Sequence, residues 1–268
     1  MQRLILQILS TSILLSSALF NHVYAQSYSI KLSDKQTNTL ATLIWQNEGA
    51  GKTEFLTVWN KNENFPSLGI GHFIWYPTSN KGPYIEQFPQ LLNYLQENNI
   101  QIPEWLTEAK VAPWKSREMF YDAFESNQLT QLRSLLHSTI GLQARFIIKR
   151  LERGIPAILE SSDEMQKIKI NKNLTTLTST PEGIFVLLDY VNFKGEGVAN
   201  NEQYQGYGWG LKQVLLAMPE QSNNVLLSFA LAADEMLTRR VKNAPRDEIQ
   251  WLKGWRVRIH KYPSLNIH

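Results

Sequence analysis

Residues 40–72 have the sequence LATLIWQNEGAGKTEFLTVWNKNENFPSLGIGH, which combines a helical pattern with a glycine-containing turn. Leu40, Ile44 and Glu48 follow one another at intervals of four residues, so on a helix they lie on the same face. The first two side chains are apolar, and that face is therefore expected to be buried. Gly49 follows at once and is a typical helix end. The stretch thus predicts a helix that delivers a carboxyl group to the edge of the core.

Residues 53–77 are rich in β-forming side chains and contain a polar turn at 60–64, which predicts a small antiparallel hairpin or sheet. After Pro83 the apolar residues recur at helical intervals. We therefore expect an α+β protein that is mostly helical, with its small sheet near the N-terminus.

The helices are expected at 30–48, 88–96, 116–124, 129–151 with a kink near 141, 182–192 and 223–241. The range 160–180 is polar and contains a short lysine run, so it is expected to be a solvated loop. We expect one domain over 26–268, with an N-terminal lobe at 26–95 and a helical lobe at 96–268 that flank a cleft.

Glu48 is the first candidate catalytic residue. A carboxyl group held against apolar neighbours loses hydration, which raises its pKa and can keep it protonated near neutral pH. A glycosidase needs such a proton donor for the leaving oxygen. The alternative is a helix-terminal glutamate that reaches solvent beyond Gly49.

The turn Ser67-Leu68-Gly69-Ile70-Gly71-His72 follows the predicted helix at a distance. Together with Glu48-Gly49, it resembles the phage-type lysozymes (endolysins), which have Glu-Gly at the end of the first helix and a later Thr-Ile-Gly-x-Gly-His. Ser67 stands here where that family has threonine. The resemblance implies a lysozyme-like fold and glycoside hydrolase activity.

Three further stretches are similar to lysozyme-like proteins, in the expected order. Residues 187–195, LLDYVNFKG, resemble an apolar helix that ends in Phe-Asn-x-Gly, and 237–240 resemble a paired-arginine helix. Residues 208–214, GWGLKQV, resemble a glycine-rich segment of goose-type lysozymes and lytic transglycosylases.

The chain departs from the phage-type pattern at the second carboxylate. Lys61 stands where that family has an aspartate that helps to position a water, and the hairpin contains an insertion. Glu63 is the nearest carboxylate that can serve as the base, and Ser67 is the candidate hydroxyl for holding the water. If no base is present, lytic transglycosylase-like chemistry with a single glutamate stays open.

The candidate substrate-binding residues are Trp59, His72, Tyr207 and Trp209. Aromatic rings can form stacking surfaces for sugars, although many are core residues. His72 ends the glycine turn and also has a structural role in the resemblance. No pair of histidines has the spacing of a zinc site, so we expect no metal and no cofactor.

The N-terminus predicts export. Arg3 precedes a mostly apolar stretch at 4–19, and Val23-Tyr24-Ala25 fits a cleavage site, so residues 1–25 are expected to be a signal peptide cut after Ala25. We expect a periplasmic or secreted protein without a stable membrane span after cleavage. The sequence contains no cysteine, so no disulfide stabilises it.

The formal net charge of +3 is too small to indicate a nucleic-acid-binding protein. The expected partner is peptidoglycan or a related amino-sugar polymer, bound by a monomer. The favoured function is cleavage of the β-1,4-linked glycan strand (muramidase-type). The alternatives are a non-catalytic lysozyme-fold protein that binds glycan or an envelope protein, and a chitinase-, chitosanase- or lytic transglycosylase-like enzyme.

Overall fold

The structure is a computed structural model and describes residues 29–79, 81–82 and 84–267. The expected signal peptide, 1–25, lies outside the described residues. The protein is rich in α-helix and has a small sheet near the start of the described chain, which confirms that part of the expected fold. No helix of the described part is both long and apolar enough to cross a membrane.

The first helix, α1 (Asp34–Gly49), begins and ends where its sequence dictates. Ser33 and Gln36 form a capping box that satisfies backbone N–H groups of the first turn. Ala50 then adopts a left-handed conformation, with φ of 51°, and ends the helix. Leu40 and Ile44 are buried as expected, so the side of α1 that carries Glu48 faces inward.

A three-stranded antiparallel sheet follows α1 and the short 3₁₀ helix η1 (Thr53–Leu56). Its strands are β1 (Thr57–Val58), β2 (Ser67–Leu68) and β3 (Phe73–Ile74). Ser67 pairs with Val58 on one side and with Ile74 on the other. The short loop between β2 and β3 is the glycine turn. The three strands confirm the small antiparallel sheet expected over 53–77.

The helices of the remaining chain are α2 (Phe88–Glu97), α3 (Glu104–Glu108), α4 (Arg117–Asp122), α5 (Asn127–Ser138), α6 (Ile140–Glu160), α7 (Glu164–Thr178), α8 (Pro181–Lys194), α9 (Leu211–Ala217), α10 (Val225–Asn243) and α11 (Ile249–Ile259). Two 3₁₀ helices, η2 (Asn200–Glu202) and η3 (Tyr262–Ser264), and a hairpin of β4 (Gln203–Tyr204) and β5 (Tyr207–Gly208) complete the fold.

The expected solvated loop at 160–180 is wrong, because most of it is α7. Asp163 and Gln166 form a capping box at its start, and Ile170, Leu174 and Leu177 are completely buried on its inner side. The lysines lie on the other sides of this helix, and they make the stretch polar overall although its buried residues recur at helical intervals.

The stretch 129–151, expected to be helical with a kink near 141, forms two helices instead of one kinked helix. The chain breaks at Thr139, close to the expected kink, and α6 continues beyond 151 to Glu160. By contrast, α8 begins at the expected Thr180-Pro181 start, where the Thr180 hydroxyl accepts a bond from the Gly183 N–H.

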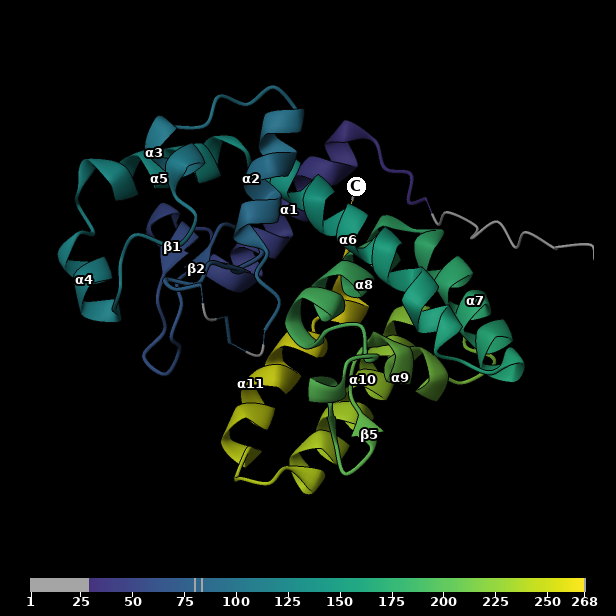
Figure 1. The fold of residues 1–268 in the computed structure, drawn as a ribbon. Coiled ribbons are helices and arrows are strands. Elements are labelled where there is room, and N and C mark those ends of the chain that lie inside the picture. The colour runs from purple at the N-terminus through teal and green to yellow at the C-terminus, as the bar shows by residue number, and fades with distance from the viewer. Residues whose placement is uncertain (1–28, 80, 83, 268) are drawn as a thin grey trace, which may run out of the picture.

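Helices α1, α6 and α8 pack against one another through the middle of the molecule. In Figure 1 the three-stranded sheet and α2 to α5 lie on one side of them, and α7 and α9 to α11 lie on the other. Helix α5 packs against β1 and η1, so residues 127–138 belong with the sheet side. Because α1 and α8 meet at this centre, their ends bring the sheet and the C-terminal helices to one place.

Candidate functional site

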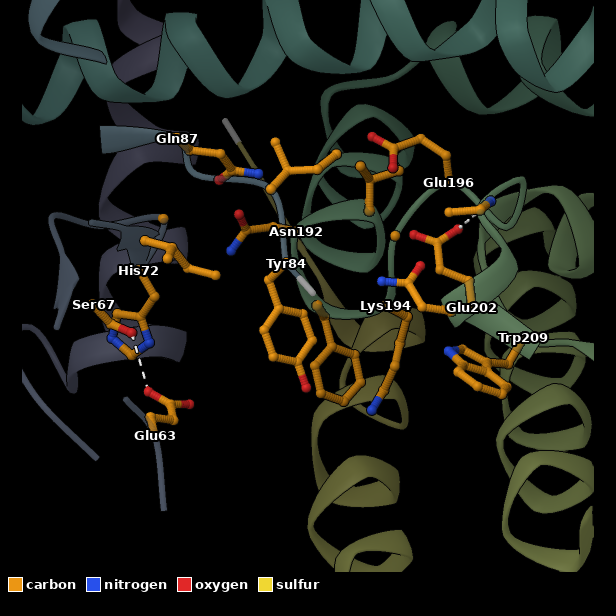
Figure 2. A pocket seen from close by; sticks show the side chains of 18 of the residues that line it. Glu63, Ser67, His72, Tyr84, Gln87, Asn192, Lys194, Glu196, Glu202 and Trp209 are labelled. Atoms are coloured by element: carbon orange, nitrogen blue, oxygen red, sulfur yellow. Dashed lines mark hydrogen bonds between the residues drawn. The ribbon is translucent and has the colours of Figure 1, made fainter. Parts of the chain in front are cut away.

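A cleft of about 1020 Å³ lies between the sheet and the C-terminal helices. Glu48, Glu63, Ser67 and His72 line its sheet side. Figure 2 shows Glu63, Ser67 and His72 on one wall, and Glu196, Glu202, Lys194 and Trp209 on the opposite wall. The three residues that the sequence nominated for catalysis therefore line one cleft, although they come from α1, the β1–β2 connection and β2.

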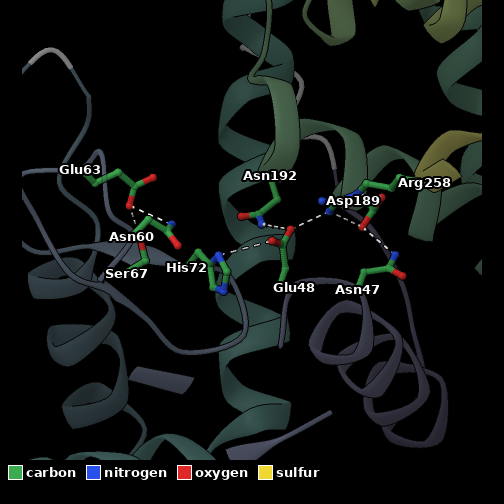
Figure 3. A network of polar contacts seen from close by, with 9 residues as sticks. All are labelled: Asn47, Glu48, Asn60, Glu63, Ser67, His72, Asp189, Asn192 and Arg258. Atoms are coloured by element: carbon green, nitrogen blue, oxygen red, sulfur yellow. Dashed lines mark hydrogen bonds and ion pairs between the residues drawn. The ribbon is translucent and has the colours of Figure 1, made fainter. Parts of the chain in front are cut away.

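Glu48 lies at the end of α1 with its side chain 12 % exposed. Its Oε1 accepts bonds from Arg258 Nη2 at 2.6 Å and from Asn192 Nδ2 at 3.2 Å, and its Oε2 lies 3.5 Å from His72 Nδ1 (Figure 3). The carboxyl group, expected to lie against apolar neighbours, has three polar side chains around it. Side chains from α8, from α11 and from the glycine turn fix its orientation.

Arg258 joins Glu48 to a second, completely buried carboxylate, Asp189. Its Nε and Nη2 donate to the two oxygens of Asp189 at 2.8 and 2.7 Å, and Tyr262 Oη donates to Asp189 at 2.6 Å. Burial acts to lower the pKa of Arg258, but Asp189 and Glu48 outweigh it, and the pKa lies well above its usual range. Arg258 is therefore a permanent cation shared by two carboxyl groups.

The glycine turn is held in place by a buried side chain of α6. Gln143 is completely buried, and its Oε1 accepts a bond from the Ile70 N–H at 2.9 Å. Gly69 has a φ of 71°, and a Cβ atom there would lie 2.4 Å from Gln143 Oε1. Only glycine suits this position, because it needs both the left-handed backbone and the close approach.

His72 follows that turn in a backbone conformation that is uncommon for a residue with a side chain, with φ of 48°. Its Nε2 is buried and has no hydrogen-bond partner, while Nδ1 faces Glu48. The strained backbone serves to aim this ring at the carboxyl group.

Glu63 lies on the β1–β2 connection and lines the same side of the cleft as Glu48. Its Oε2 accepts bonds from Asn60 Nδ2 at 3.0 Å and from Ser67 Oγ at 3.4 Å (Figure 3). Its backbone carbonyl accepts a bond from Trp59 Nε1 at 2.8 Å. The insertion in the hairpin thus forms a structured turn that presents a carboxylate next to Ser67.

The four candidate substrate-binding residues differ in position. Trp59 is only 2 % exposed and does not line the cleft; its ring instead supports the turn that carries Glu63. Tyr207 is 54 % exposed and lies outside the cleft lining, beside Arg239. His72 and Trp209 do line the cleft, but Trp209 is largely buried, with its ring against Arg240.

The wall opposite the sheet carries a second group of acids that the sequence analysis missed. Glu202 accepts bonds from the backbone N–H groups of 197–199, and Glu196 pairs with Arg150 at 3.3 Å. Burial and then the nearby Glu196 raise the pKa of Glu202 above its usual range. The three backbone bonds show that Glu202 fixes the conformation of this loop. Gly195 also lies next to the Glu202 carboxyl group, and a Cβ atom at that position would clash with it.

The two neighbouring arginines of α10 have different partners, and Arg240 is the one that pairs with an acid. It donates to the completely buried Glu248 at 2.8 Å, and Arg246 and Tyr204 contact the same carboxylate. Arg239 instead donates to the backbone carbonyl of Gly208.

Sequence reasoning also missed Asp189, Asn192, Lys194 and Arg258. A signal for the first was present, because Asp189 is a charged residue inside the apolar run of α8. Among the described residues, no group of three histidine, cysteine, aspartate or glutamate side chains could hold a metal ion.

Comparisons of the chain with models of known protein families, with curated proteins and with solved structures found no match.

Proposed function

We propose that this chain is an exported, lysozyme-like glycosidase that cleaves the β-1,4-linked amino-sugar strand of peptidoglycan. One observation carries the proposal: Glu48 and Glu63 line the same cleft, each held by its own polar contacts, with Ser67 bonded to Glu63. Two carboxyl groups on either side of a bound sugar are what glycoside hydrolysis needs.

In this proposal Glu48 is the acid and Glu63 is the base. Glu48 gives a proton to the leaving glycosidic oxygen, while Glu63 takes one from a water that attacks the anomeric carbon. Ser67 orients that water beside Glu63. An inverting enzyme of this kind separates its two carboxyl groups by about 6.5 to 9.5 Å, so that the water fits between them.

The two carboxyl oxygens of Glu48 have different partners. Oε1 receives Arg258 and Asn192 at 2.6 and 3.2 Å, whereas Oε2 has the longer contact of 3.5 Å with His72. Oε2 is therefore the oxygen that exchanges a proton with the ligand. His72, Asn192 and Arg258 are positioning residues in this account.

The ion pair of Glu48 with Arg258 favours a second candidate function, the binding of glycan or an envelope protein without cleavage. A carboxylate already neutralised by a permanent cation can be a structural element of a binding cleft. The two functions predict different products from the same incubation.

The experiment is to incubate the purified protein, without residues 1–25, with insoluble peptidoglycan, chitin oligomers and chitosan oligomers. New reducing ends from peptidoglycan support the glycosidase. Anhydro-sugar ends indicate a lytic transglycosylase, and preferred cleavage of chitin or chitosan indicates a chitinase- or chitosanase-like enzyme. Pelleting with the wall and no released product supports the binding protein and contradicts cleavage.

A further inference from the structure

Lys194 is a buried lysine that faces the cleft without an acidic partner. It is the last residue of α8, is only 9 % exposed, and lines the cleft wall opposite the sheet (Figure 2). Its ammonium nitrogen lies 3.4 Å from the centre of the Trp255 ring and 3.9 Å from that of Phe193. Among the residues that the structure describes, no carboxylate lies within ion-pair distance of it.

Two arginines also contact the same two rings. The Arg258 guanidinium carbon is 4.4 Å from the Phe193 ring centre, and that of Arg240 is 4.9 Å from the Trp255 ring centre. Lys194 thus shares the Phe193 ring with Arg258 and the Trp255 ring with Arg240.

The two arginines have carboxylate partners, whereas Lys194 has none among the described residues. Arg258 pairs with Glu48 and Asp189, and Arg240 pairs with Glu248. Burial, followed by the charges of Arg240 and Arg258, holds the pKa of Lys194 well below its usual range, although Glu248 acts in the opposite direction. Burying an ammonium group without a counter-ion costs free energy, so an anion that enters the cleft and pairs with Lys194 is stabilised there.

We propose that Lys194 binds a carboxylate of the ligand, and hence that the substrate is an acidic glycan whose sugars carry carboxylates. This inference rests on the proposed function and specifies its substrate class. A singly charged carboxylate suits the site better than a phosphate dianion, because Glu196 and Glu202 line the same wall and repel a second negative charge. The carboxylate can belong to the lactyl group of a muramic acid that carries no stem peptide, or to a uronic acid.

The test is isothermal titration calorimetry of the purified protein with four tetrasaccharides. They are an alternating N-acetylglucosamine–N-acetylmuramic acid tetramer with free lactyl carboxylates, its methyl ester, a tetramer of a uronic acid, and the neutral N-acetylglucosamine tetramer. The wild-type protein is expected to bind the free acid at least about tenfold more tightly than the ester, a difference of about 1.4 kcal/mol.

Lys194→Met keeps the length of the side chain without its charge and should abolish this preference. Lys253→Met is the matched control, because Lys253 is an exposed lysine on α11, and it should keep the preference. The comparison of acid with ester in the wild type does not depend on any variant folding. Tight binding of the uronic acid tetramer extends the class to uronic acids, and its weak binding restricts the class to muramic acid.

Equal affinity of the wild-type protein for acid and ester would overturn the inference, as would a preference that survives in Lys194→Met. If the neutral tetramer binds in either case, the proposed glycan function stands and only the role of Lys194 is lost. Absence of binding to all four tetrasaccharides would contradict both proposals.

Discussion

Arg258 Nη2 lies 2.6 Å from Glu48 Oε1, and the two residues are 210 positions apart in the chain. This contact joins the last helix of the fold to the end of the first. Arg258, which the sequence analysis did not identify, thus bonds directly to the first catalytic candidate, Glu48. The stability of the cleft and the orientation of Glu48 therefore depend on the same guanidinium.

Replacing Arg258 by methionine is expected to destabilise the protein by about 3 to 5 kcal/mol, because it leaves the buried Asp189 without its cation. The free energy of unfolding in urea measures this. Arg256→Met, which breaks the more exposed pair with Asp234, is the control and should cost less than about 1 kcal/mol. Equal losses for the two variants would refute the account of Arg258.

Gln143→Leu should destabilise the glycine turn, because the Ile70 N–H loses its acceptor inside the core. An unpaired buried donor costs about 1 to 3 kcal/mol, which thermal or urea unfolding can resolve. Glycan cleavage should fall as well, because the turn aims His72 at Glu48. Gln128→Leu, on the exposed side of α5, should change neither quantity. A fully active and fully stable Gln143→Leu variant would contradict this reasoning.

Glu248 is expected to make stability depend on acid pH. Burial acts to raise the pKa of Glu248, but bonds from Arg240, Tyr204 and Arg246 outweigh it, and the pKa is lowered. A carboxyl whose folded-state pKa is depressed contributes stability above its unfolded pKa of about 4.3, and this is lost as pH falls through the folded value.

The unfolding free energy of the wild type should therefore exceed that of Glu248→Gln at pH 7, and the gap should narrow in acid. If the difference in unfolding free energy between the two proteins stays constant from neutral pH down to the pH at which they unfold, the charge of Glu248 does not contribute to stability.

The sequence could predict the local parts of the site but not its long-range contacts. The apolar residues at four-residue intervals up to Ile44, followed by Gly49, predict the end of α1. Residues 67–72 predict the turn. Both features depend only on residues that are neighbours in the sequence. Arg258 and Asn192 reach Glu48 only through tertiary packing, which no local spacing reveals. Glu63 lies on the cleft wall, and its role as the base remains a prediction.

Two errors have a common physical origin. The composition of residues 160–180 predicts a loop because the lysines of α7 dominate it, while the buried side of this helix needs only a few apolar residues such as Ile170 and Leu174. Trp59 was assigned to a sugar-binding surface because aromatic content alone does not tell which face of a hairpin is covered. Its indole is buried and bonded to the Glu63 carbonyl.

Binding of an acidic tetrasaccharide should weaken with rising pH, because the lowered pKa of Lys194 removes its charge earlier than for an ordinary lysine, which titrates near about 10.4. The groups that face Lys194 are Arg240, Arg258 and Glu248; the two arginines stay charged and Glu248 stays ionised at alkaline pH. Calorimetry in two buffers of different ionisation enthalpy should detect proton uptake on binding. Affinity that is flat with pH and free of proton uptake would argue against a Lys194 contact.

The most direct measurement of the central claim is the rate at which reducing ends are released from purified peptidoglycan by the wild type and by Glu48→Gln. The glutamine can still accept the bond from Arg258, so both proteins should unfold at similar urea concentrations. Glu54→Gln, at an exposed position of η1, is the control and should match the wild type. The account predicts a loss of at least about 100-fold in Glu48→Gln. Release that continues at the wild-type rate in Glu48→Gln, or no release by the wild type, would contradict it.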